Sequence, residues 1–216
     1  MKETAPSFCL NSGAFCFSKE WKFKMLILAS GSPRRRELLH LITDEFAVHT
    51  SEVDERAISA PNARLLVQKL ALEKAAAVQK DYPGDTIIGC DTVVELEGEV
   101  LGKPENPTQA AAMLRALSGK THFVHTGVCI LQQDSEDLFC ESSNVTFSPL
   151  SEAEIAAYIA TSEPYDKAGG YGIQGGAAKF IRRIEGCYFN IMGLPVSALY
   201  QHLQRQNEKN DELSDK

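Results

Sequence analysis

Residues 25–39, MLILASGSPRRRELL, hold the local pattern that decides the fold. The run MLILAS is apolar and has the length of a strand, and the glycine and serine that follow it end the run. Ser32 is a residue type that caps helices, and Pro33 suits the first helical position. The stretch therefore predicts a strand, a tight loop and a helix in direct succession.

Three consecutive arginines, Arg34 to Arg36, stand where this helix is expected to begin. The helix macrodipole disfavours each exposed cation there by about 0.3–1 kcal/mol, while the free N–H groups favour an anion. Because successive helix residues point about 100° apart, the three side chains cannot all face one ligand. We expect one or two to bind phosphate and another to pair with an acid, such as Glu37 or one elsewhere in the fold. A solvated basic turn is the alternative.

The rest of the chain alternates between strand-like and helix-like segments, without an internal repeat. Strands are expected within residues 46–50, 85–104, 121–133 and 138–150, the second with a turn near residues 97–98. Helices are expected within residues 61–84, 106–120, 151–164 and 195–206. This order indicates an α/β or α+β sheet with helices packed on it.

Composition and charge restrict the class of protein. The 216 residues are 44% hydrophobic and 24% charged, which is ordinary for a globular protein. A net charge of −7 argues against a nucleic-acid partner or an anionic membrane surface. The six cysteines show no C-x-x-C spacing, so a reducing cytoplasm fits best. No apolar run approaches the roughly 20 residues that cross a bilayer, so no membrane partner is expected.

We expect three parts along the chain. Residues 1–24 lack the apolar run of a secretory signal and precede a second methionine, which predicts a disordered N-terminal extension or a misplaced start. Residues 25–203 contain the periodic segments and predict one folded domain. Residues 204–216 are polar and predict a fraying C-terminal tail.

Asp91 is the most informative single acid, because it stands in an otherwise apolar strand. A carboxylate there costs free energy unless it is paired, hydrogen-bonded or bound to a metal. On a two-residue period it faces away from Thr92. Glu55 and Lys74 supply a further carboxylate and a lysine, and Mg²⁺ binds one or two carboxylates together with substrate phosphates. An acid that satisfies a loop at the end of a strand is the alternative.

Two glycine-containing motifs do not indicate the nucleotide folds that they suggest. Residues 119–121, GKT, lack the earlier glycine of a phosphate loop, because Leu114 occupies that position. Residues 168–176, AGGYGIQGG, do not follow a strand as a dinucleotide fingerprint does. The latter segment still predicts a backbone that approaches a flat ligand, with the Gln174 amide on a base edge. A mobile surface loop is the alternative.

Seven motifs follow one another in a set order: LASGSPRRRELL, VDE, LALEKA, GCDTVV, GEVLGKP, EPYDKAGGYGIQG and GLPV. Taken together, they resemble the Maf family of nucleotide pyrophosphatases from residue 25 to about residue 203. The resemblance implies a mixed α/β sheet with flanking helices, in which two lobes enclose a cleft. It also implies a homodimer that hydrolyses nucleoside triphosphates to the monophosphate and pyrophosphate with a divalent cation, Mg²⁺ or Mn²⁺.

The resemblance implies roles for particular residues. It makes Asp91 the proton acceptor, with Lys74 and Lys103 at the phosphates. The branch of the family that acts on dTTP and UTP, rather than 7-methyl-GTP, has an arginine after S-x-S-P, a threonine after the aspartate and a glutamine in YGIQG. The candidate substrate-binding residues are Ser32, Arg34, Arg35, Lys74, Thr92, Lys103 and Gln174, and the candidate metal ligands are Glu55 and Asp91.

The expected reaction is hydrolysis of dTTP and UTP, and of modified pyrimidine triphosphates, as housecleaning of the nucleotide pool. A positioned carboxylate accepts the proton of the attacking water, and Asp91 suits the role of base, of metal ligand or of both. A nucleotide-binding regulator without turnover is the alternative, since Maf proteins have also been linked to inhibition of septum formation. An RNA-binding module conflicts with the acidic balance.

Overall fold

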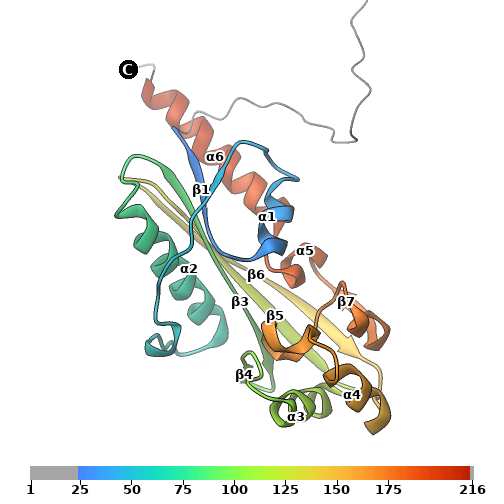
Figure 1. Ribbon diagram of the computed structural model, residues 1–216. Helices are drawn as coiled ribbons and strands as arrows, with labels where there is room; N and C mark the ends of the chain where they lie inside the picture. The colour runs from blue at the N-terminus through green and yellow to red at the C-terminus, as the bar shows by residue number, and fades with distance from the viewer. Residues whose placement is uncertain (1–23, 215–216) are drawn as a thin grey trace, which may run out of the picture.

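The computed structural model describes residues 24–214, with side chains described up to residue 208. These residues form a seven-stranded mixed sheet with helices packed on it (Figure 1), which confirms the expected fold class. The strand order is β2-β1-β3-β5-β6-β7, and β4 pairs with β3 outside this path. The prediction of a disordered extension falls on residues 1–24, nearly all outside the described part.

Most elements lie where the sequence predicts them. The strands are β1 (Leu26–Ala29), β2 (Ala47–Val48), β3 (Thr86–Leu96), β4 (Glu99–Leu101), β5 (Thr121–Leu131), β6 (Glu136–Phe147) and β7 (Ile181–Glu185). The α-helices are α1 (Pro33–Leu39), α2 (Ala63–Gln79), α3 (Pro107–Leu117), α4 (Glu152–Ile159), α5 (Tyr188–Met192) and α6 (Val196–Ser214). Short 3-10 turns are η1 (Glu55–Ala57), η2 (Glu163–Asp166), η3 (Ala168–Gly170) and η4 (Gly176–Phe180).

The opening stretch folds as its sequence predicts. β1 pairs in parallel with β2 and with β3, because α1 and α2 carry the chain back between these strands. The side chain of Ser32 caps α1 by accepting from the backbone N–H of Arg35 at 3.5 Å, and Pro33 occupies the first turn. The later strands pair antiparallel through β3, β5, β6 and β7.

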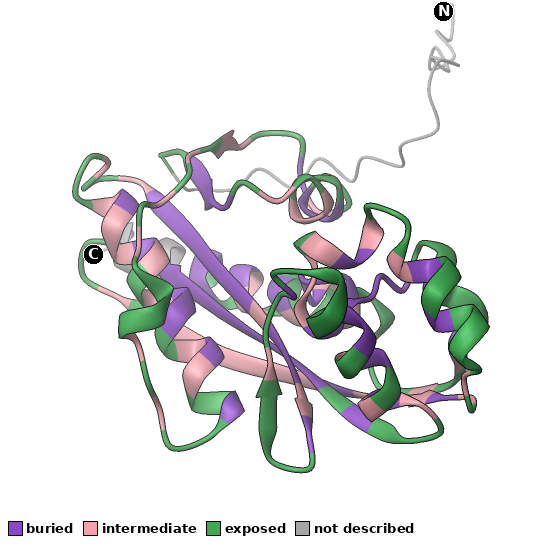
Figure 2. Cartoon of the chain, turned by 60° about the horizontal axis from the view of Figure 1, so that its bottom comes forward, coloured by how far each residue is buried: buried purple, intermediate pink, exposed green. Residues whose placement is uncertain are grey.

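Helices cover both faces of the sheet beside β1 (Figure 1), and much of the sheet between them is buried (Figure 2). Leu26 and Leu28 belong to a core that includes Leu39 of α1 and Leu199 of α6. The alternate residues of β1 point to the other face, where Ala71 and other residues of α2 cover the sheet. Alternation of side chains along an extended strand produces this division.

A second core lies at the far ends of the long strands. There Val94 of β3, Val124 of β5 and Phe147 of β6 pack with α3 and α4, and Figure 1 places these helices away from α1, α2 and α6. The same long strands therefore run through both packed regions, which are the two lobes expected from the family resemblance.

Helix α2 lies unusually close to the sheet at two glycines. A Cβ at Gly89 would lie 2.0 Å from the carbonyl oxygen of Ala71, and one at Gly127 would lie 2.3 Å from that of Val67. Both distances are far below van der Waals contact. The glycines therefore set the distance between α2 and the strands β3 and β5.

The expectation of a fraying tail from residue 204 is wrong for residues 204–214, which continue α6. The apolar face of the helix extends through Leu203, and the polar Gln206 that follows is only 5% exposed. Asp137 of β6 holds this part of the helix, since its Oδ2 lies 2.8 Å from His202 Nδ1 and 3.5 Å from Gln206 Nε2. Polar composition alone did not reveal these partners.

Among the described residues, no helix combines the length and apolar character of a membrane span.

His122 makes the second core sensitive to acid. Burial lowers the pKa of His122 from 6.5 to about 4. Its Nε2 lies 2.7 Å from the Tyr171 hydroxyl, whereas its buried Nδ1 has no hydrogen-bond partner among the described residues, so a second ring proton would find no acceptor.

The folded state therefore resists protonation of His122 where the unfolded chain accepts it. Stability is full above pH 6.5 and falls as the pH drops toward 4, and we expect a loss of about 2 kcal/mol between pH 7 and pH 5. Denaturant unfolding at several pH values measures this loss. His122→Gln should remove this part of the pH dependence, and an unchanged slope in that variant would contradict the assignment.

Candidate functional site

The candidate site lies where β3 lacks a neighbour along one edge. β1 ends opposite Gly89, and the antiparallel β4 pairs with β3 only from Val94 to Leu96. Among the described residues, no strand pairs with the intervening segment, 90–93, on that side. A cavity of about 730 Å³ opens there, within the usual range of small-molecule sites.

Eight of the nine candidate residues line this cavity: Ser32, Arg34, Arg35, Glu55, Lys74, Thr92, Lys103 and Gln174. They come from segments far apart in sequence, including the loop before α1, the helix α2 and the glycine-rich segment. Asp91 is the exception. Its side chain is only 10% exposed, and it forms an ion pair with Lys74, which lines the cavity.

Lys74 links the two candidate carboxylates. Its Nζ lies 2.6 Å from Asp91 Oδ1 and 2.7 Å from Glu55 Oε1. The side chains of Lys74 and Asp91 are nearly buried, whereas that of Glu55 is half exposed. Asp91 and Lys74 face each other because both point into the space between β3 and α2. Thr92 points to the opposite face, as the alternation along β3 predicts.

Burial raises the pKa of Glu55, but positive neighbours outweigh this effect. The hydrogen bond from Lys74, together with the charges of Lys74, Lys103 and Arg35, holds the pKa below its usual value. Glu55 is therefore a carboxylate at neutral pH. This leaves a negatively charged group facing a cavity that is otherwise rich in cations.

Arg35 is fixed by hydrogen bonds to four neighbours. Its Nε donates to the Gly193 carbonyl oxygen at 2.9 Å, and its Nη1 donates to Ser30 Oγ at 3.3 Å and the Cys90 carbonyl oxygen at 2.8 Å. Its Nη2 donates to Thr92 Oγ1 at 3.0 Å. The side chain thus connects α1, the open edge of β3 and the loop after α5.

The neighbouring arginine has a different role. Arg34 Nη1 lies 3.3 Å from Asp166 Oδ2, so an ion pair joins α1 to η2. This confirms that one of the three arginines pairs with an acid elsewhere in the fold. Arg36 is exposed and does not line the cavity.

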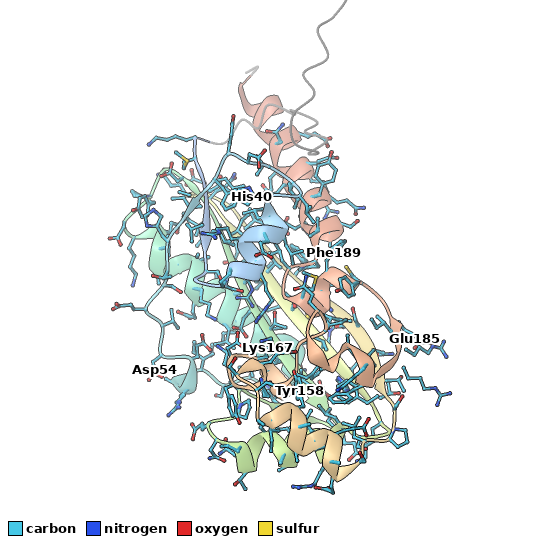
Figure 3. The ribbon with its side chains drawn as sticks, turned by 45° about the vertical axis from the view of Figure 1, so that its right-hand side comes forward. His40, Asp54, Tyr158, Lys167, Glu185 and Phe189 are labelled. Carbon is cyan, nitrogen blue, oxygen red and sulfur yellow. The ribbon has the colours of Figure 1, made fainter. Side chains whose placement is uncertain are left out.

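Sequence reasoning gave no role to Glu163, Asp166 and Lys167, which all line the cavity. Lys167, labelled in Figure 3, donates to Asp166 Oδ1 at 2.6 Å and to the Glu163 carbonyl oxygen at 2.8 Å. The available signal was the run EPYDK, which gathers charged residues directly before the glycine-rich segment.

Glu163 organises the glycine-rich segment. Its carboxylate accepts from the Tyr158 hydroxyl at 2.8 Å and from the backbone N–H of Gly176 at 2.8 Å. A Cβ at Gly175 would lie 2.1 Å from Glu163 Oε1, so a larger residue would collide with the carboxylate. These contacts favour a structured wall over the alternative of a mobile loop, and Gln174 is exposed toward the cavity.

Apolar side chains complete the lining, among them Val94, Val124, Ile191 and Met192. A cavity that combines cations with an apolar wall suits a ligand with an anionic part and a flat, weakly polar part. A nucleotide has both parts.

The donor set also fits a divalent cation. No group of three or more metal-binding side chains occurs within the described residues. However, Asp91 and Glu55 already share one positive charge, the Lys74 ammonium, so both can face a single cation. Mg²⁺ commonly takes only one or two protein carboxylates and completes its coordination with water and phosphate.

The sequence of this chain matches that of known proteins over nearly all of the described residues. Residues 25–206 match the family described as Maf-like protein. The dTTP/UTP pyrophosphatase of Geobacillus sp. (strain WCH70) is 50% identical over 182 residues, covering 84% of this chain and 98% of that protein. The dTTP/UTP pyrophosphatase of Bacillus cereus (strain ATCC 10987 / NRS 248) is 48% identical over 186 residues, covering 85% and 91% respectively. Among solved structures, the Ham1 protein of Staphylococcus aureus aligns with 57% of this chain and 72% of that chain, at 16% identity and a TM-score of 0.45.

Proposed function

Because this chain belongs to the Maf-like protein family, we propose that it hydrolyses dTTP and UTP to the nucleoside monophosphate and pyrophosphate. The single observation that carries the proposal is the pairing of Lys74 with both Asp91 and Glu55, at a cavity that further cations line. Relatives named dTTP/UTP pyrophosphatase supply the substrate class. The chain is accordingly a hydrolase of nucleotide metabolism.

The cations of the cavity suit a triphosphate. Arg34, Lys74, Lys103 and Lys167 line it from four different segments. Charge-assisted hydrogen bonds from such groups stabilise the phosphates and the departing pyrophosphate. The phosphates would compete with Asp166 for Arg34 and with the two carboxylates for Lys74. Substrate binding thus loosens the ion pairs that hold these side chains.

Asp91 is the proposed general base. Water that attacks the α-phosphorus must lose a proton, and the bond to the bridging oxygen of pyrophosphate breaks. Asp91 accepts that proton at its carboxylate, while Lys74, drawn toward the phosphates, no longer occupies the space between Asp91 and the cavity. Lys74 therefore orients Asp91 before the substrate binds.

We also propose a divalent cation, Mg²⁺ or Mn²⁺, bound by Glu55 and Asp91 together with the phosphates. It would supply positive charge that stabilises the negative charge developing on the phosphoryl group. The ionised state of Glu55 at neutral pH supports this role.

The proposed specificity residues are Thr92, Gln174 and an arginine of α1. Thr92 and Gln174 line the cavity beside its apolar wall, which suits a pyrimidine base. The resemblance points to Arg34, but the hydrogen bond to Thr92 comes from Arg35. Arg35, already a candidate substrate-binding residue, is therefore the arginine that we propose to shape the base site.

The wider setting of the reaction is also proposed. The described cysteines, Cys90, Cys129, Cys140 and Cys187, are free thiols, which agrees with a reducing cytoplasm. Removal of modified pyrimidine triphosphates would keep the nucleotide pool clean for polymerases. The homodimer rests on the family resemblance.

Pyrophosphate release with Mg²⁺ or Mn²⁺ tests the proposed function on dTTP, UTP, CTP, GTP and 7-methyl-GTP. We expect kcat/KM for dTTP and UTP to exceed that for CTP by at least about tenfold, the discrimination that one mismatched polar contact provides. Faster turnover of 7-methyl-GTP would overturn the specificity. Tight binding of dTTP without any pyrophosphate release would favour a nucleotide-binding regulator instead.

A further inference from the structure

A chain of hydroxyl groups runs from the cavity into the protein interior. Thr92 Oγ1, which lines the cavity, lies 2.9 Å from Thr126 Oγ1 on β5. Thr126 Oγ1 in turn lies 2.9 Å from the backbone carbonyl oxygen of Asn190 in α5. Thr126 and Asn190 are fully buried, at 0% exposure, so water does not replace either contact.

The direction of these hydrogen bonds follows from the number of protons available. A carbonyl oxygen has no proton, so the contact with Asn190 requires the hydroxyl proton of Thr126. Thr126 then has none left for Thr92, and the contact between the two threonines requires the proton of Thr92. The hydroxyl of Thr92 is thereby committed as a donor toward the interior.

Arg35 places a hydrogen-bond donor beside Thr92. It donates from Nη2 to Thr92 Oγ1, which leaves one acceptor lone pair on that oxygen. The hydrogen bonds of Arg35 to the described residues engage four of its five N–H groups, and the remaining one belongs to Nη2. An acceptor on Thr92 therefore stands beside a donor on Arg35, and both residues line the cavity.

We infer that Thr126 is a specificity-determining positioning residue, which fixes Thr92 as a hydrogen-bond acceptor for the imide edge of uracil or thymine. That edge carries an N3–H donor beside a carbonyl acceptor, the complement of the pair formed by Thr92 and Arg35. Cytosine has a bare N3 acceptor, which would meet the lone pair of Thr92. The inference rests on the proposed function and deepens it, because it assigns the discrimination to a residue that does not touch the base.

Replacing Thr126 by valine tests this role, because valine keeps the shape of threonine and removes its hydroxyl. The hydroxyl of Thr92 then no longer donates to residue 126, so it can turn and donate its proton to N3 of cytosine. We expect the ratio of kcat/KM for UTP over CTP to fall about tenfold, and the ratio of the affinities for UMP and CMP to fall with it. Ratios taken within one variant are independent of the fraction of protein that is folded.

Two variants act as controls. Thr126→Ser keeps the hydroxyl and should keep the wild-type ratios. A second pair of threonines, Thr121 of β5 and Thr146 of β6, has hydroxyl oxygens 2.8 Å apart and lies outside the cavity lining. Thr121→Val removes one hydroxyl of that pair. It should also leave both ratios unchanged.

The two readouts separate this inference from the proposed function. If the wild type releases no pyrophosphate from any nucleotide, the proposed function fails, while calorimetric binding of UMP and CMP still tests Thr126. Wild-type ratios in Thr126→Val would overturn the inference, as would equal affinity of the wild type for UMP and CMP.

Discussion

Asp91→Asn is expected to lower kcat/KM for UTP by about 1000-fold or more, since a positioned general base contributes roughly 10²–10⁴ in rate. The amide has the shape of the carboxylate but cannot take the proton of the attacking water. It also removes one of the two carboxylates proposed to hold the metal. Pyrophosphate release by the purified variant measures the loss.

The variant should remain folded, because Lys74 keeps Glu55 at 2.7 Å as a partner and the amide oxygen can still accept its hydrogen bond. Glu95→Gln is the matched control. Glu95 lies on the same face of β3, four residues further along, and pairs with His125 outside the cavity lining. It should retain activity within a few-fold of wild type. Activity of Asp91→Asn within tenfold of wild type would remove Asp91 from the role of base.

Gly127→Ala is expected to lower the free energy of unfolding by about 3 kcal/mol or more. Its Cβ would lie 2.3 Å from the carbonyl carbon and oxygen of Val67 and 2.6 Å from the backbone nitrogen of Gln68. These are backbone atoms, which no rotamer change can move away. The helix α2 would have to shift from the sheet, and Lys74 would shift with it.

Chemical denaturation, or the soluble yield if the variant does not fold, measures this effect. Gly102→Ala is the control, because a Cβ at Gly102 meets no atom within 4 Å. Its free energy of unfolding should stay within about 0.5 kcal/mol of wild type. A Gly127→Ala protein as stable as this control would show that α2 does not rest on the sheet as described.

The sequence predicted the elements well because its local signals agree with the tertiary packing. Ser32 and Pro33 mark the start of α1, and Ser151 with Glu154 forms the capping box expected for α4. The helix expected within residues 195–206 continues as α6 to Ser214. The sequence did not predict this continuation, because the polar Gln206 is stabilised by Asp137, a partner about 70 positions earlier. No local pattern contains that contact.

The sequence predicted which residues form the candidate site better than it predicted their contacts. Eight of the nine candidate residues line one cavity, and the alternation along β3 placed Asp91 and Thr92 on opposite faces. The division of labour between Arg34 and Arg35 was not predictable, because it depends on Asp166 and Gly193, which the fold brings from distant segments. Thr126 was missed for the same reason, since a threonine in an apolar strand carries no signal of what it contacts.

The long strands that pass through both lobes have a consequence for how the molecule unfolds. β3 and β5 each contribute side chains to the core beneath α1 and α6 and to the core beneath α3 and α4. Neither lobe can lose its packing without withdrawing strands from the other, so the lobes are not independent folding units. The chain should melt in one cooperative transition, and a fragment cut between the lobes would retain neither core.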